Sequence, residues 1–170
     1  MKVISYFWPF CLSLIGIFGL QACSKLSADT STTTATSQQW MVNINEAYAL
    51  SVKEQKPVLA YFTSSDTCGQ CKQLDVNVFS SPTFTTWAEK KVVLFKVDFA
   101  TLDQLPKGSQ EQNTAMAQSL KATTYPTIWM LNVTHEVENG RFKVKPLGYT
   151  GYQPSPEKLI GALQNFVPRK

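Results

Sequence analysis

Apolar and polar positions change period several times between residues 43 and 167, and these changes divide the chain into predicted helices and strands. Asn43 offers a cap for a helix that Pro57 ends, and the apolar run "VLAYF" behind it is typical of a buried strand. Later runs rich in β-branched and aromatic residues predict further strands. In chain order the predicted elements are helix 46–56, strand 58–62, helix 68–79, helix 82–91, strand 92–99, helix 110–122, strand 127–131, strand 141–149 and helix 156–167.

This order, βαβ followed by ββα, predicts an α/β fold with a central mixed β-sheet flanked by helices. The chain has 170 residues and 44% hydrophobic content, which suits one domain. Its formal net charge is +4 and its charges form no runs, so composition gives no indication of nucleic-acid binding.

The first 22 residues are predicted to be a signal peptide. Lys2 is followed by apolar residues and then by Leu20-Gln21-Ala22-Cys23, which resembles the bacterial lipobox. In that pattern cleavage precedes the cysteine, and Cys23 becomes the lipidated first residue. The alternative is an uncleaved membrane helix, because the apolar stretch approaches the ~20 residues that span a bilayer.

A polar segment rich in Ser and Thr follows at 23–39 and is predicted to be a flexible tether, because it cannot bury enough surface to order itself. Trp40 marks the return of apolar spacing. Residues 40–170 therefore form the predicted folded domain.

Cysteine usage points to the chemistry. Processing would remove Cys11 and acylate Cys23, which leaves Cys68 and Cys71 as the thiols of the mature chain. A close cysteine pair in an exported protein is either a small structural disulfide or a redox centre. Closing so short a loop constrains the unfolded chain little, which argues against a structural disulfide. A zinc site normally needs four ligands, and the mature chain adds only His135, in a predicted polar turn, so no metal or cofactor is expected.

A strand, then "CGQCK" opening a helix, then "TTYPT" entering a later strand resembles the thioredoxin superfamily over residues 40–167. Within it, the chain looks most similar to exported thioredoxin-like reductases, which include the Dsb-type periplasmic disulfide reductases. The resemblance implies a thioredoxin-like fold in which Cys68, at the helix start, is the nucleophile and Cys71 resolves the mixed disulfide. Gly69 and Gln70, between the cysteines, are predicted to contact substrate.

Pro126 stands at the position of the family's cis-proline, which lies beside the active cysteines. The resemblance therefore implies a cis Tyr125–Pro126 bond, and Thr124 and Tyr125 become candidates for β-type pairing with an extended substrate. Without the resemblance, a trans proline at a strand start would be expected, because only about 5–6% of X–Pro bonds are cis.

Two positions depart from the thioredoxin pattern. Tyr61 occupies the place of the buried aspartate that moves the resolving thiol's proton, and Thr67 replaces the tryptophan before the first cysteine. Asp75, four residues after Cys71, matches an acidic residue of another exported member of the superfamily, the C-terminal domain of the membrane thiol:disulfide interchange reductase, and is the candidate substitute acid. The alternative for Asp75 is a solvated carboxylate on a helix face.

The direction of electron flow follows from the residues between the cysteines. Gly69-Gln70 carries no charge to stabilise a thiolate, which favours a reductase over an oxidase, with an isomerase third. A non-catalytic binding lipoprotein or metallochaperone stays open, although Met116 and Met130 are expected in the core.

The expected partners are disulfide-containing exported proteins and a membrane or periplasmic thiol reductant, with the chain itself a monomer. Its expected location is the periplasmic side of a bacterial membrane. Ser24 is not the aspartate that signals inner-membrane retention, so the outer membrane is favoured.

Overall fold

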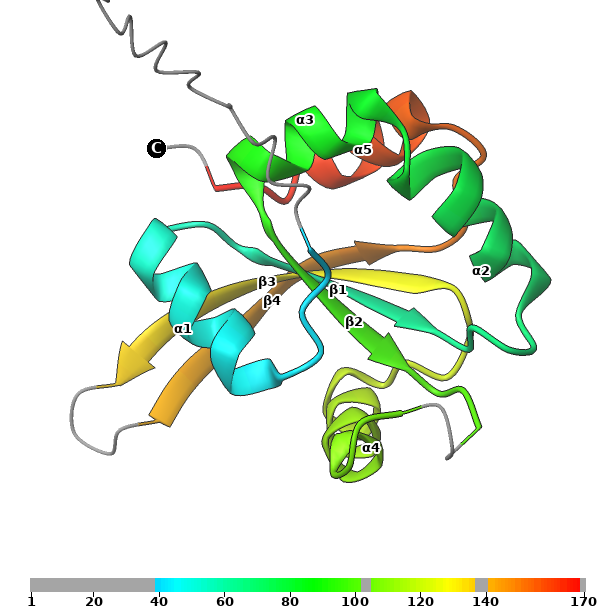
Figure 1. Cartoon of the computed structure of the whole chain (residues 1–170). Helices are drawn as coiled ribbons and strands as arrows, with labels where there is room; N and C mark the ends of the chain where they lie inside the picture. Colours follow the sequence, from blue (N-terminus) through cyan, green and yellow to red (C-terminus); the bar gives the residue numbers. More distant parts are fainter. Residues whose placement is uncertain (1–38, 102–104, 137–140, 169–170) are drawn as a thin grey trace, which may run out of the picture. The chain divides into compact units, whose positions relative to one another are not determined.

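A four-stranded mixed sheet forms the centre of the computed structural model, which describes residues 39–101, 105–136 and 141–168 (Figure 1). The strand order is β2-β1-β3-β4. β1 runs parallel to β2, and β3 runs antiparallel to both β1 and β4. The bounds are Val58–Thr63 for β1, Val93–Asp98 for β2, Thr127–Glu136 for β3 and Arg141–Thr150 for β4.

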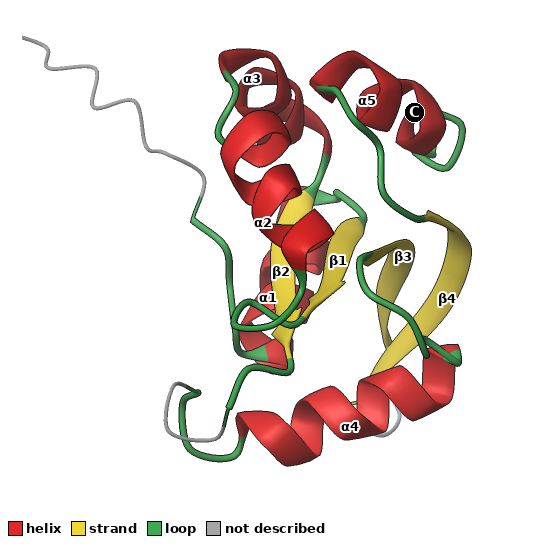
Figure 2. Ribbon diagram, turned by 90° about the vertical axis from the view of Figure 1, so that its right-hand side faces the viewer, coloured by secondary structure: helices red, strands yellow, loops and turns green. Residues whose placement is uncertain are grey.

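Helices cover both faces of this sheet, which confirms the predicted α/β class. Those in the described ranges are α1 (Ile44–Glu54), α2 (Gly69–Leu74), the π-helix η1 (Asp75–Phe79), α3 (Pro82–Lys91), α4 (Ser109–Leu120) and α5 (Pro156–Gln164). Apolar residues of α1 and α4 pack on one face, and those of α2, η1, α3 and α5 on the other. Figure 2 shows α4 on the opposite side of the molecule from α3 and α5.

β1 is buried on both faces, because helices cover both. Leu59 and Tyr61 point into the core under α2, α3 and α5, whereas Ala60 and Phe62 point into the core under α1 and α4. This explains why the strand is a continuous apolar run rather than an alternating one. Met116 and Met130 lie in these cores, as expected.

The segment before α1 joins the sheet beside β2. Met41 N–H donates to Leu94 O at 3.0 Å, and Lys96 N–H donates to Met41 O at 2.8 Å. Trp40 packs against Tyr61, with ring centroids 5.6 Å apart, and against Phe79 at 5.0 Å. Trp40 therefore belongs to the core behind the cysteine-bearing helix.

The helix starts follow from local capping residues. Asn43 Oδ1 accepts from the N–H groups of Asn45 and Glu46, and Ser81 Oγ accepts from Phe84 N–H. Pro82 stands in the first turn of α3, where its missing N–H costs nothing. These features confirm the predicted starts.

Two predictions about local structure were wrong. The helix expected over 68–79 is α2 followed by the π-helical turn η1, in which Val76 is 72% exposed. His135 was expected in a polar turn, but it lies within β3 and pairs with Phe142. The antiparallel ladder extends β3 beyond its apolar run, because β4 supplies hydrogen-bond partners as far as Glu136.

Residues 1–38 lie outside the described part of the chain, so the predicted signal peptide, Cys23 and nearly all of the tether fall there. The Asn139-Gly140 turn signal before the predicted strand 141–149 lies in residues 137–140, which are also outside the described part. Within the described residues, no helix is long and apolar enough to cross a membrane.

Candidate active site

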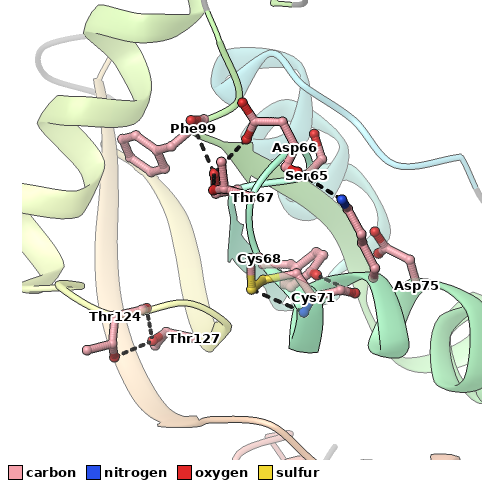
Figure 3. The surroundings of a disulfide bond; sticks show 12 residues. Ser65, Asp66, Thr67, Cys68, Cys71, Asp75, Phe99, Thr124 and Thr127 are labelled. Atoms are coloured by element: carbon pink, nitrogen blue, oxygen red, sulfur yellow. Dashed lines mark hydrogen bonds between the residues drawn. A yellow bond between two sulfur atoms is a disulfide. The ribbon is translucent and has the colours of Figure 1, made fainter.

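A disulfide joins Cys68 and Cys71 where β1 leads into α2 (Figure 3). The sulfur atoms are 2.04 Å apart and the Cα atoms 5.2 Å apart. Cys68 is the N-cap of α2, and its Sγ accepts a hydrogen bond from Cys71 N–H at 3.1 Å. A helix N-cap leaves backbone N–H groups free to face its side chain, which favours negative charge on that sulfur.

The two cysteines differ in exposure. Cys71 is fully buried, whereas Cys68 is partly exposed and is followed by the exposed Gly69 and Gln70. An external sulfur can therefore approach Cys68 and not Cys71.

A hydrogen-bonded turn before Cys68 fixes its position. Cys68 N–H donates to Ser64 O at 2.9 Å, while the Ser64 hydroxyl donates to Asp66 and shares a hydrogen bond with Thr67. Asp66 also accepts from Thr101 N–H at 3.0 Å, and the Ser64 hydroxyl is the main reason that the pKa of Asp66 is lowered. Asp66 was not among the site residues predicted from the sequence.

The loop before β3 faces the disulfide from another side, and Figure 3 shows Thr124 and Thr127 on it. The Tyr125–Pro126 bond is cis, as the resemblance implied. The Thr127 hydroxyl donates to Thr124 O at 2.6 Å, so that carbonyl is already engaged within the loop. Tyr125 is 36% exposed and stacks on Phe99, with centroids 5.3 Å apart, which presents an aromatic ring beside the site.

Asp75 is half-buried behind the disulfide rather than fully solvated. Its carboxylate lies 3.7 Å from Lys96 Nζ, and the same ammonium lies 3.9 Å from Asp98. Burial is the main reason that the pKa of Asp75 is raised, while Lys96 acts against the shift. A carboxyl group with a raised pKa can exchange a proton closer to neutral pH than an ordinary aspartate.

Tyr61 contacts the turn that carries Cys71 and interacts with Asp75. Its side chain is fully buried, and its hydroxyl donates to Cys71 O at 3.2 Å. Burial raises the pKa of Tyr61, so the phenol stays protonated and acts as a donor. The position that lacks the family's aspartate therefore carries a neutral hydroxyl group.

Within the described ranges, no cluster of three or more His, Cys, Asp or Glu side chains is placed to hold a metal ion.

A mixed sheet with helices on both faces, a C-x-x-C disulfide at a helix start and a cis-proline loop beside it define the class of thioredoxin-like proteins. The family described as "Thioredoxin-like" matches residues 39–132, more than half of the chain. The chain belongs to this family.

Two curated relatives come from Chlamydia pneumoniae. The chain is 24% identical over 120 residues to "Disulfide bond reductase DsbH", covering 71% of this chain and 66% of the relative. It is 27% identical over 97 residues to "Thioredoxin-related protein DsbJ", covering 57% of this chain and 27% of the relative. The matched region thus spans just under two thirds of the first relative and about a quarter of the second.

Solved structures support the fold. "DsbH Oxidoreductase" superposes with a TM-score of 0.64 at 22% identity, covering 89% of this chain and 94% of that one. A thioredoxin from Thermus thermophilus gives a TM-score of 0.56 at 23% identity, covering 75% and 85%. The thioredoxin-like fold predicted from sequence is confirmed.

Proposed function

We propose that this protein is an exported thiol-disulfide oxidoreductase that reduces substrate disulfides through Cys68 and Cys71. The observation that carries the proposal is the unequal pair of sulfur atoms, one partly exposed at a helix N-cap and one buried behind it. That asymmetry suits a nucleophile that meets the substrate and a resolving thiol that does not.

The reaction proceeds by two exchanges. The Cys68 thiolate attacks one sulfur of a substrate disulfide, the substrate S–S bond breaks, and its second sulfur leaves as a thiolate that takes up a proton. The Cys71 thiol then loses its proton and attacks Cys68 sulfur, which releases the other substrate sulfur. The substrate has gained two electrons, and the Cys68–Cys71 disulfide has formed. A thiol reductant returns the pair to the dithiol.

Asp75 is the group proposed to accept the Cys71 proton. It follows Cys71 by one helical turn, is half-buried, and has a raised pKa caused mainly by burial. These properties are those of a carboxylate that can take a proton from a buried thiol during the resolving step.

The direction of transfer rests on the surroundings of Cys68. Gly69 and Gln70 bring no charge to its thiolate, and Lys72, the next basic residue, donates to Asp66 O at 2.8 Å. A thiolate with few stabilising partners makes the dithiol a stronger reductant. The name of the 24% identical relative, a disulfide bond reductase, agrees with this direction.

Substrates are proposed to bind as extended segments along Gly69, Gln70 and the loop of Thr124, Tyr125 and Pro126. Thr124 and Tyr125 are exposed next to the buried Pro126. Because the Thr124 carbonyl already accepts from Thr127, we assign β-type pairing mainly to the Tyr125 backbone, with the Tyr125 ring covering the partner chain.

The lipid anchor at Cys23 and the periplasmic location, with the outer membrane favoured, are part of the proposal and rest on the lipobox-like sequence. The partners are disulfide-containing exported proteins and a membrane-bound or periplasmic thiol reductant, with the chain acting as a monomer. Replacing Cys23 by Ala is expected to release the protein from the membrane fraction or to block processing. A variant that stays membrane-bound with residues 1–22 intact would contradict the anchor.

The activity is tested by insulin reduction with dithiothreitol, using the mature chain with Cys23→Ser so that only Cys68 and Cys71 remain. The protein is expected to accelerate insulin precipitation, and Cys68→Ser is expected to abolish the effect. A parallel Zn²⁺ and Cu⁺ titration of the reduced protein separates the alternative: tight metal binding without catalysis would indicate a metallochaperone instead.

A further inference from the structure

The hydroxyl group of Tyr61 lies among polar groups of three elements. It donates to Cys71 O at 3.2 Å, a long bond for a hydroxyl donor, and it also interacts with Thr63 and with the carboxyl group of Asp75.

We propose that Tyr61 is a positioning residue of the resolving step: its hydroxyl holds the Cys71 turn and the Asp75 carboxylate together, so that Asp75 receives the Cys71 proton. The inference rests on the proposed function and adds a residue to it. Tyr61 touches neither substrate nor the reacting sulfur, and it acts through Asp75.

The ring of Tyr61 is fixed so that its hydroxyl can serve this purpose. Trp40 packs on it at 5.6 Å and Phe79 at 4.8 Å, in tilted and edge-on arrangements. Lys96 Nζ lies 5.9 Å from the ring centroid. A side chain enclosed in this way cannot change rotamer without disturbing its neighbours.

The charges that face Asp75 come from β2, where Lys96 and Asp98 lie, and the neutral titratable group that interacts with it is Tyr61 on β1. The ammonium of Lys96 is shared between two carboxylates, at 3.7 and 3.9 Å, so it compensates Asp75 only in part. The Tyr61 hydroxyl, which donates to Cys71 O, also interacts with Asp75, and this interaction lowers the pKa of that carboxyl group against the effect of burial.

The resolving step is balanced as follows. The Cys71 S–H proton passes to the Asp75 carboxylate, and the Cys71 sulfur forms a bond to Cys68 sulfur while the bond from Cys68 to the substrate breaks. The electron pair of that bond leaves on the substrate sulfur, which takes up a proton from Asp75 or from water. The Tyr61 hydroxyl keeps its own proton throughout, because burial raises its pKa.

The test compares two tyrosine-to-phenylalanine variants of the mature chain with Cys23→Ser. Tyr61→Phe removes the hydroxyl and keeps the ring contacts. Tyr48→Phe is the matched control. Tyr48 lies on α1 and is also buried, but it packs on the other face of the sheet, edge-on to Phe142. The readout is the pH dependence of the resolving rate, followed by stopped flow after mixing with a peptide disulfide.

Tyr61→Phe is expected to move the acid limb of this profile to higher pH and to slow resolution several-fold at pH 7, with KM unchanged. Tyr48→Phe is expected to follow the wild type. In an Asp75→Asn background, Tyr61→Phe is expected to have no further effect. The inference would be overturned if the acid limb of the Tyr61→Phe profile stayed at the wild-type pH. It would also be overturned if Tyr61→Phe shifted the profile by the same amount in the Asp75→Asn background.

A second measurement keeps the test decisive if Tyr61→Phe folds poorly or if the wild type fails to reduce insulin. 3-Fluorotyrosine incorporated at position 61 keeps the hydroxyl and makes it a stronger donor. NMR titration of the Asp75 carboxyl carbon in the oxidised protein is then expected to show a lower pKa than in the wild type. An unchanged pKa would overturn the inference whether or not the protein is a reductase.

Discussion

At the scale of single residues, the unequal environments of Cys68 and Cys71 carry the proposed chemistry. Cys68 is the N-cap of α2 and accepts a hydrogen bond from Cys71 N–H, whereas Cys71, within α2, is fully buried. The cysteine pair at a helix start was predictable from "CGQCK", because a helix start is a local sequence signal. The Tyr61, Asp75 and Lys96 cluster was not, because its members come from three elements that only the fold brings together.

Thiol reactivity is expected to follow these environments. In the reduced mature chain with Cys23→Ser, Cys68 is expected to react with iodoacetamide at pH 7 at least tenfold faster than Cys71, read by mass spectrometry of peptides. Cys71→Ala is expected to accumulate mixed disulfides through Cys68, and Cys68→Ala to accumulate few. Preferential trapping through Cys71 would reverse the assigned roles.

The ionised Asp75 carboxylate is expected to lower the free energy of unfolding. Its folded pKa is raised, mainly by burial, so the native state binds more protons than the unfolded state between the ordinary value of 3.8 and the raised pKa. The free energy of unfolding therefore falls as pH rises through that window. Asp75→Asn is expected to be more stable than the wild type at pH 7, with the difference shrinking in acid, as measured by urea unfolding of the oxidised proteins.

Asp66→Asn provides the control of opposite sign. The pKa of Asp66 is lowered, mainly by the Ser64 hydroxyl, so its contribution to stability is present above the ordinary value of 3.8 and is lost as pH falls through the lowered pKa. This variant is expected to be less stable than the wild type at pH 7. Equal effects of the two variants would show that neither carboxylate titrates as its surroundings require.

At the scale of elements, the starts of helices were easier to predict than their continuity. Asn43 and Ser81 cap α1 and α3 where the sequence indicates, because capping depends on one side chain and the next turn. The change from α2 to η1 has no comparable local signal. It places Leu74, Val78 and Phe79 in the core and leaves Val76 exposed, a result that depends on packing against the sheet.

The N-cap of α3, Ser81, is expected to contribute to the free energy of unfolding. Ser81 Oγ accepts from Phe84 N–H at 3.2 Å and donates to Val78 O at 2.7 Å, so it joins η1 to α3. Ser81→Ala is expected to lower the free energy of unfolding by about 1 kcal/mol. Thr86→Ala, at an exposed position within α3, is expected to change it by less than ~0.5 kcal/mol. An equal loss in both variants would contradict the capping role.

At the scale of the whole molecule, the mixed sheet and the helices on its faces followed from the sequence pattern, because each element carries its own period. The β3–β4 ladder extends past the apolar run of β3, and that length depends on pairing between strands rather than on either sequence alone. The fold brings the α2 start and the loop of Pro126 to one end of the sheet, so the proposed substrate surface is a property of the assembled domain.

The reduction potential of the Cys68–Cys71 pair tests the reductase proposal most directly. Reference values are about −270 mV for thioredoxin and about −120 mV for a strong oxidant of the same superfamily, a gap of roughly 7 kcal/mol for a two-electron couple. Gly69-Gln70 supplies no cation to the Cys68 thiolate, and a helix terminus contributes at most ~2 kcal/mol. Equilibration of the mature chain with Cys23→Ser against glutathione is expected to give a potential at or below about −220 mV. A value above about −160 mV would contradict the account and indicate an oxidase or an isomerase.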